Sequence, residues 1–280
     1  MNAQSGGPQF EGPQEIPGIK SIIAVGSGKG GVGKTTLSVN LALALARLGN
    51  KVGLLDADIY GPNIPLMLGE GGSPDLTPDN RLIPPERYGL RVISIGYLTP
   101  GDKPLVWRGP MLHGVIKQFL SQVEWGELDY LIVDLPPGTG DVVISLTQSV
   151  PLTGAVVVTT PSGVSLQDAR KAIEMFKEVR VELLGIVENM SYLMCPHCNH
   201  EIDVFSSGGG ERTAKAYGVP FLGRIEMDPT IREGGDSGYP VVLNGEQANN
   251  AKSLFAFARK VKERADEVKS AGTGGVLSID

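Results

Sequence analysis

The sequence predicts an α/β fold, a doubly wound and mostly parallel sheet with helices on both faces. From Ser21 onward, apolar runs of strand length alternate with stretches of helical periodicity, which is the pattern of parallel βαβ units. A glycine-rich run over 28–33 stands between the first expected strand and the first expected helix. The 280 residues are 41% hydrophobic, which is enough to build a sizeable core without disulfides.

The expected elements follow one another along the chain. The first strand, 22–25, leads through the glycine-rich run to a helix over 34–48, which stops at Gly49-Asn50. The further strands are expected at 52–55, 90–95, 130–133, 155–159, 184–187 and 221–225, and the further helices at 111–123, 166–179, 211–217 and 246–268. Residues 71–88 contain four prolines and two glycines, so we expect no regular structure there.

The chain has no repeat of fixed period and no long linker. We therefore expect one domain over 19–269, preceded by a flexible leader over 1–18 and followed by a loose tail over 270–280. The net charge of −6 and the pI near 5.2 argue against nucleic acid or an anionic membrane as the main partner. Neither a signal peptide nor an apolar run of about 20 residues is present, which predicts a cytoplasmic protein.

The glycine-rich run satisfies the pattern Gly-x4-Gly-Lys-[Ser/Thr] of a P-loop. Its backbone N–H groups and the positive end of the following helix suit phosphate oxygens. Lys34 is expected to bridge the β- and γ-phosphates of ATP, and the Thr35 hydroxyl to bind Mg²⁺. The predicted phosphate-binding residues are Gly28, Lys29, Gly30, Gly31, Val32, Gly33, Lys34, Thr35 and Thr36.

Carboxylates follow two of the expected strands, at the edge of the sheet where α/β folds bind ligands. Asp134 ends the strand 130–133 and precedes Pro-Pro-Gly-Thr-Gly-Asp, as expected for a Walker-B aspartate followed by a loop that senses the γ-phosphate. Asp58 is the candidate for orienting the hydrolytic water, with Asp56 supporting the metal shell. In the alternative interpretation, Asp56 and Asp58 only cap a turn.

A second lysine inside the loop, Lys29 in Lys-Gly-Gly-Val-Gly-Lys-Thr-Thr, resembles the deviant Walker A motif of the MinD/ParA/nitrogenase-iron-protein superfamily. In that superfamily the equivalent lysine reaches the nucleotide of a second protomer, so the resemblance implies a homodimer that sandwiches ATP. A second cation at the scissile phosphates would stabilise developing charge. Lys29, Lys34 and Asp58 are thus the predicted catalytic residues of an ATPase. The alternative for Lys29 is a solvated side chain at a loop tip.

Within that superfamily the chain resembles the Mrp/ApbC-type iron-sulfur cluster carrier ATPases from about residue 18 to 260. The stretches that match, in order, are Asp56-Ala-Asp-Ile-Tyr-Gly-Pro-Asn-Ile-Pro65, Trp107-Arg-Gly-Pro-Met111, Asp134-Leu-Pro-Pro-Gly-Thr-Gly-Asp141, Val187-Glu-Asn-Met-Ser191, Cys195-Pro-His-Cys198 and Phe221-Leu-Gly-Arg-Ile225. The resemblance implies that Asn189 contacts the adenine edge. It also implies slow hydrolysis that acts as a switch, with a cluster donor and apo iron-sulfur proteins as partners.

Cys195 and Cys198 are the only cysteines, and two thiolates are half of the four ligands that a cluster usually takes. Together with the family resemblance, this implies a [4Fe–4S] cluster that bridges two protomers. The alternative is zinc, because Cys-x2-Cys is also half of a zinc knuckle, to which His197 or His200 could add nitrogen.

Two other functions compete with the carrier. One is a spatial organiser like the cell-division or plasmid-partition ATPases, with a structural zinc, in which the last helix could bind a membrane through an apolar stripe. The other is an electron-transfer ATPase like the nitrogenase iron protein, which the absence of a cysteine between Asp134 and Thr147 disfavours.

Overall fold

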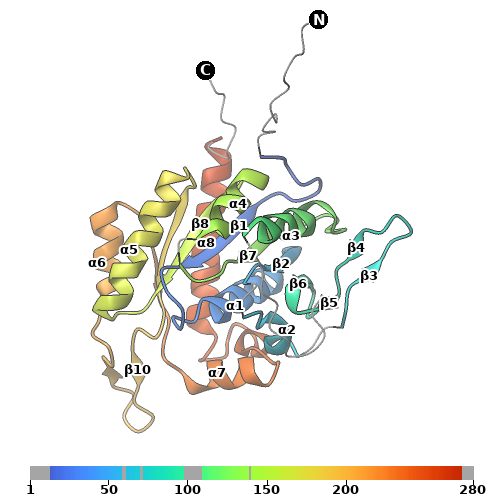
Figure 1. Cartoon of the computed structure of the whole chain (residues 1–280). Helices are drawn as coiled ribbons and strands as arrows, with labels where there is room; N and C mark the ends of the chain where they lie inside the picture. The colour runs from blue at the N-terminus through green and yellow to red at the C-terminus, as the bar shows by residue number, and fades with distance from the viewer. Residues whose placement is uncertain (1–12, 59–60, 70–71, 98–108, 139, 273–280) are drawn as a thin grey trace, which may run out of the picture.

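The computed structural model describes residues 13–58, 61–69, 72–97, 109–138 and 140–272. Its centre is an eight-stranded sheet in the order β12-β9-β8-β1-β7-β2-β6-β5, in which β5 alone runs antiparallel to its neighbour (Figure 1). Its strands are β1 Ile22–Ser27, β2 Val52–Asp56, β5 Glu86–Arg87, β6 Leu90–Ser94, β7 Tyr130–Asp134, β8 Gly154–Thr159, β9 Leu183–Glu188 and β12 Phe221–Arg224. The predicted doubly wound, mostly parallel α/β fold is confirmed.

Helices cover both faces of the sheet (Figure 1). One apolar cluster receives side chains from α1 Lys34–Arg47, α2 Ile64–Met67, α7 Pro229–Asp236, the 3-10 helix η2 Val241–Asn244 and α8 Lys252–Ser270. The other receives them from the 3-10 helix η1 Ile95–Tyr97, α3 Gly109–Ser121, α4 Asp141–Ser149, α5 Gly163–Glu178 and α6 Gly209–Tyr217. The strands feed both clusters because successive side chains point to opposite faces, so Ile23 and Val25 join the first cluster while Ile22 and Ala24 join the second.

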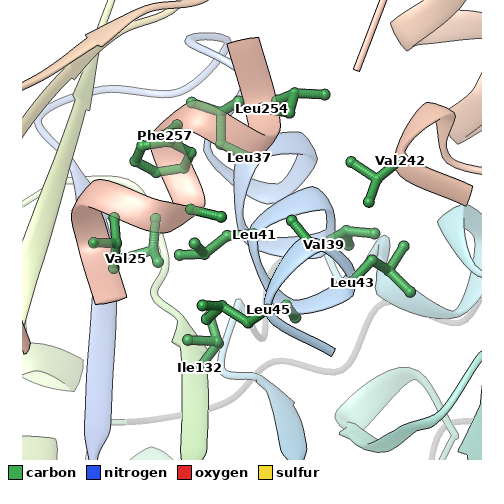
Figure 2. Packing of buried hydrophobic residues seen from close by; sticks show 14 of the residues in the cluster. Val25, Leu37, Val39, Leu41, Leu43, Leu45, Ile132, Val242, Leu254 and Phe257 are labelled. Carbon is green, nitrogen blue, oxygen red and sulfur yellow. The ribbon is translucent and has the colours of Figure 1, made fainter. Parts of the chain in front are cut away.

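Helix α1 packs against the sheet and against α8, which lies beside it on the same face, and its buried residues include every position from Leu37 to Leu45. Figure 2 shows Leu37 and Leu41 near Phe257 of α8, and Leu45 near Ile132 of β7. Because α1 carries the P-loop on its N-terminal end, this packing fixes the loop to the rigid centre of the domain.

The apolar stripe of α8 is also buried, with every member at most 5% exposed. Its members are Leu254, Phe255, Ala258, Val261, Ala265 and Val268. The stripe therefore packs inside the domain instead of offering a face to a membrane. Among the described helices, none combines the length and apolar content that crossing a bilayer requires.

The expectation that residues 71–88 lack regular structure was wrong. A hairpin forms from β3 Asp75–Leu76 and β4 Leu82–Ile83, and its turn ends at Asn80, which has φ 61°. The Thr-Pro-Asp-Asn sequence of this turn, with proline second and asparagine in the left-handed region, is a turn signal within the proline-rich stretch. Strand β5 then turns back into β6 through Tyr88 and Gly89, both with positive φ.

Other differences concern the elements between the predicted ones. The prediction missed α2, α4, α7 and the hairpin of β10 Leu193–Met194 and β11 Glu201–Ile202. Helix α7 does carry a start signal, because Asp228 caps it by accepting from the Thr230 N–H at 2.8 Å, with Pro229 at the first helical position. The last helix begins at Lys252 instead of 246 because residues 246–251 form turns.

The two ends of the chain are only partly described. Of the predicted leader, residues 13–18 follow the body, where Gln14 N–H donates to the Ser149 carbonyl at 3.0 Å. Helix α8 extends to Ser270, so the predicted tail begins one residue early. Residues 1–12 and 273–280 lie outside the described residues, as do Trp107 and Arg108 of one family motif.

Candidate functional site

The P-loop joins β1 to α1 at the carboxyl edge of the sheet. Gly31 and Gly33 have φ of 77° and 82°, in the left-handed region that favours glycine. Gly33 is the residue from which α1 begins, so the N-terminal N–H groups of that helix face the loop. The loop is held on its outer side by the Asn189 side-chain amide, which donates to the Val32 carbonyl at 2.8 Å.

Two glycines of this loop are required by packing, and one of them, Gly33, also has a positive φ. A Cβ on Gly28 would lie 2.0 Å from the Asp168 carbonyl oxygen, so the loop touches the backbone of α5. A Cβ on Gly33 would lie 2.2 Å from the Asn189 amide nitrogen. By contrast, nothing lies within 4 Å of a Cβ added to Gly30 or Gly31. Gly30 and Gly31 are therefore the part of the loop that leaves its backbone open to a ligand.

The predicted phosphate lysine lies in a buried cluster of charges. The Lys34 ammonium is 2.8 Å from Asp134 Oδ2 and 3.6 Å from Asp58 Oδ2, and its side chain is 6% exposed. Thr35 Oγ1 donates to Asp134 Oδ2 at 2.7 Å. The structure thus brings Lys34, Thr35, Asp58 and Asp134 together, although they come from three separate segments of the chain.

Asp56 also belongs to this cluster and is completely buried. Its carboxylate accepts hydrogen bonds from Ser94 Oγ at 2.9 Å and from the Asp58 N–H at 3.1 Å. Burial, together with the negative charge of Asp134, raises the pKa of Asp56 to about 8. The carboxylate also accepts from the Ile64 N–H at 3.4 Å, so Asp56 ties the loop after β2 to α2.

These residues fit Mg²⁺ and a nucleoside triphosphate. Even with Asp56 protonated, the two carboxylates of Asp58 and Asp134 face the single ammonium group of Lys34, so the cluster can accept further positive charge. Carboxylate and hydroxyl oxygens are the ligands that Mg²⁺ takes in proteins. An open P-loop backbone beside them suits phosphates.

A pocket of about 560 Å³ opens beside the P-loop, in the size range of small-ligand sites. Its lining includes Gly33, Thr36, Asn189, Met227, Pro229 and Arg232. Asn189 therefore lies between the loop and this pocket, and its Nδ2 donates to the Val32 carbonyl. Its contact with adenine stays a prediction.

Lys29 is half-buried, and the described residues include no ion pair to it.

The two cysteines lie in the loop of the hairpin β10–β11, which projects from the body below α5 and α6 (Figure 1). The Cys195 N–H donates to the His200 carbonyl at 2.9 Å, and the Asn199 N–H donates to the Cys195 carbonyl at 2.9 Å. Hydrogen bonds from the N–H groups of His197 and Cys198 hold the pKa of the Cys195 thiol below its usual value. This environment favours the thiolate, which is the form that binds metals.

Cys195 is half-buried and Cys198 is exposed. Within the described part of the chain, no three or more His, Cys, Asp or Glu side chains come together in an arrangement that could hold a metal ion. His197 and His200 therefore do not complete a zinc site with the two thiols in this conformation. One chain offers two thiols, at an exposed position.

A protein-family model described as the NUBPL iron-transfer P-loop NTPase within ParA matches residues 18–262. The chain belongs to this family. The expected resemblance to iron-sulfur cluster carriers of the P-loop superfamily is therefore confirmed.

Curated relatives of this family carry consistent names. The chain is 52% identical over 253 residues to an iron-sulfur cluster carrier protein of Synechocystis, covering 89% of this chain and 72% of the relative. It is 54% identical to one from Methanocaldococcus jannaschii, covering 90% and 86%. It is 46% identical to the mouse iron-sulfur cluster transfer protein NUBPL, covering 89% and 79%.

Solved structures agree with the fold. A nucleotide-binding protein from Archaeoglobus fulgidus in complex with ADP matches with a TM-score of 0.72 and 37% identity, covering 84% of this chain and 92% of that one. The cell-division ATPase MinD from Pyrococcus furiosus matches with a TM-score of 0.63 and 26% identity, covering 87% and 98%. The family and these neighbours identify the chain as a P-loop NTPase.

Sequence reasoning missed three polar residues that hold this NUBPL-type site together. Ser38 Oγ lies 2.6 Å from Asp134 Oδ1, Ser94 donates to Asp56, and the buried Glu188 accepts from Ser191 at 2.6 Å. Ser38 offered one signal, because it lies one turn after Lys34 on a helix that is otherwise apolar there. Ser94 offered none, because its partner Asp56 lies on a strand that is its neighbour only in the sheet. Glu188 and Ser191 lie three residues apart in one of the stretches that match the family, but the sequence does not show that they bind each other.

Proposed function

We propose that this protein is an ATP-hydrolysing carrier that binds an iron-sulfur cluster between two protomers and delivers it to apo-proteins. The observation that carries the proposal is the presence of two sites in one chain. One is a P-loop with a buried cluster of lysine and carboxylates. The other is an exposed pair of thiols, one of which is activated by backbone N–H groups.

Each residue of the nucleotide site has a role that follows from its position. Lys34 and the N–H groups of the open loop bind the phosphates, and Thr35 with Asp134 holds Mg²⁺. When bound, Mg²⁺ neutralises charge on the phosphate oxygens. Asp58 lies at the rim of the cluster, 14% exposed, where it orients a water molecule. Lys29 supplies a second positive charge from one protomer to the nucleotide of the other.

The cluster is the cargo, and the position of the thiols suits loading and release. The two thiols of one chain are half of the usual four ligands, and a second copy supplies the rest. A projecting hairpin lets two copies approach without steric hindrance from the body. Hydrolysis then acts as a switch on the dimer, which needs no rapid turnover. A cytoplasmic location and the absence of membrane or nucleic-acid partners are part of this proposal.

The test is anaerobic reconstitution with iron and sulfide, followed by transfer to an apo iron-sulfur protein. We expect four irons and four sulfides per dimer, lost in Cys195→Ser/Cys198→Ser. Phosphate release from ATP should fall about a hundredfold in Lys29→Ala. Lys252→Ala, an exposed lysine at the start of α8 that donates to Asn249, is the control and should keep both activities. Tightly held zinc without cluster uptake in the wild type would contradict the carrier function.

A further inference from the structure

The hairpin that carries the cysteines leaves the body at the end of β9, directly after the residue that contacts the P-loop. Glu188 ends β9, Asn189 donates to the loop, and Met190 adopts φ 51°. Three residues after Met190 the chain enters β10. The same turn therefore has the nucleotide site on one side and the root of the cysteine hairpin on the other.

This turn is held by a directed line of hydrogen bonds. Arg224 of β12 donates from Nε to Ser191 Oγ at 2.9 Å. Ser191 in turn donates to Glu188 Oε1 at 2.6 Å, because its single proton must point away from the arginine N–H. The other Glu188 oxygen accepts from the Gly210 N–H at the start of α6. Glu188 is completely buried, so these bonds satisfy a carboxylate that is shielded from bulk solvent.

The same guanidinium holds the outer strand of the hairpin. Arg224 Nη2 forms an ion pair with Glu201 of β11, and its Cζ lies 4.6 Å from the centre of the Tyr192 ring. Tyr192 leads into β10, and its carbonyl accepts from the Met227 N–H at 2.7 Å. Among the hydrogen bonds and ion pairs of the described residues, Arg224–Glu201 is the one that joins β11 to the body.

The strength of this connection follows from the geometry of the guanidinium. A planar group with several donors in fixed directions can bind a hydroxyl on one side and a carboxylate on another while its plane lies over an aromatic ring. A lysine ammonium has no such fixed plane, so it cannot hold these three partners in set directions. The ion pair itself is partly exposed, with side chains 32% and 42% accessible, so it contributes little to stability. Its effect is to orient the hairpin.

We infer that Arg224 is a positioning residue that couples the nucleotide site to the cysteine hairpin. A nucleotide that contacts Asn189 moves the turn from Glu188 to Ser191, and Arg224 passes this movement to Glu201. The orientation of Cys195 and Cys198 then depends on nucleotide. This inference rests on the proposed function, because it assumes that the P-loop binds a nucleotide. It adds the residue that transmits the effect of nucleotide binding to the cysteines that hold the cluster.

The experiment measures alkylation of the metal-free protein by iodoacetamide, with and without Mg·ADP. The chain has two cysteines, both in the hairpin, so mass spectrometry reads each rate directly. ADP is used because it is not hydrolysed. In the wild type we expect the nucleotide to change at least one rate by about fivefold, the lower end of usual allosteric coupling.

Two variants break the same contact from its two sides. In Arg224→Gln and in Glu201→Gln the ratio of rates with and without ADP should fall to about one, while the affinity for ADP changes by less than about twofold. Because both act through one contact, the double variant should be no different from either single variant. Arg259→Gln, which removes an exposed arginine–glutamate pair between α8 and Glu246, should behave as the wild type.

The outcomes separate this inference from the carrier function. If the alkylation rates of the wild type are the same with and without ADP, Arg224 does not couple the sites. The same conclusion follows if both variants keep the full change in rate that ADP causes in the wild type. If the response is present in the wild type and lost in both variants while no cluster can be reconstituted, the coupling stands and the carrier function fails.

Discussion

Replacing Ser38 with alanine tests whether the buried carboxylate of Asp134 depends on the hydroxyls around it. Ser38 is completely buried on α1, and its Oγ lies 2.6 Å from Asp134 Oδ1 and 3.0 Å from the Lys34 carbonyl. The hydroxyl has one proton, and the shorter contact to the charged acceptor takes it. Asp134 Oδ2 already accepts from Thr35 and faces Lys34, so in Ser38→Ala no other side chain replaces the lost donor at Oδ1.

The expected cost follows from the charge of the acceptor. A hydrogen bond to a charged group contributes about 1.5–3 kcal/mol, against about 1 kcal/mol for a neutral pair. Ser38→Ala should therefore lower the free energy of unfolding by about 2 kcal/mol and the Tm by about 4–8 °C. The assay is urea unfolding at pH 7 without nucleotide or magnesium, with circular dichroism as the signal that monitors unfolding.

Ser121→Ala is the matched control. Ser121 lies on the exposed side of α3 and donates to the Lys117 carbonyl at 2.7 Å, four residues earlier, which is the same helical contact without a carboxylate. We expect its effect to stay within about 0.5 kcal/mol. If Ser38→Ala costs no more than Ser121→Ala, the reasoning that assigns the hydrogen bond to Asp134 is refuted.

Two further predictions concern the same site. Asp56 holds a proton in the folded state up to about pH 8, whereas the unfolded carboxyl loses it near its ordinary pKa of 3.8. The folded state therefore binds more protons between these values, so stability falls as pH rises toward 8, by at most about 1.4 kcal/mol per pH unit, and then levels off. Urea unfolding of the nucleotide-free protein from pH 5 to 9 should show a flatter profile for Asp56→Asn, and equal slopes would count against a buried protonated carboxyl. Gly28→Ala should destabilise the protein by about 3 kcal/mol because its Cβ would meet the backbone of α5, whereas Gly30→Ala should stay within about 1 kcal/mol, and equal unfolding midpoints would disprove the packing argument.

The architecture and the position of the nucleotide site could be predicted from the amino-acid sequence alone. Strand-length apolar runs alternating with helical ones predict a parallel sheet because this order is local and periodic, and β1, β2, β7, β8 and β9 follow it closely. The P-loop is equally local, since its glycines, lysine and threonine are consecutive. Even Asp56 and Asp134 could be placed at one edge, because both end parallel strands that turn out to be neighbours, with Asp56 in register with Asp134.

Short elements escaped this reasoning where their signals were brief. The β3–β4 hairpin has two residues in each strand, too few for an alternating pattern, and proline dominated the interpretation of the stretch around it. Helix α7 is eight residues long and contains two glycines, so its apolar periodicity is weak and its cap at Asp228 was the better signal. The hairpin β10–β11 forms around the cysteine loop without any pattern of its own.

The residues that support the site could be identified only from the folded chain. Gly28 appears in the P-loop motif as a phosphate contact, yet its Cβ position is occupied by the backbone of α5, 140 residues later. Ser94 reaches Asp56 because β6 pairs with β2, and Arg224 reaches Ser191 because β12 pairs with β9. Such contacts depend on which strands are adjacent in the sheet, and adjacency is set by packing of the whole core instead of by the residues near each position.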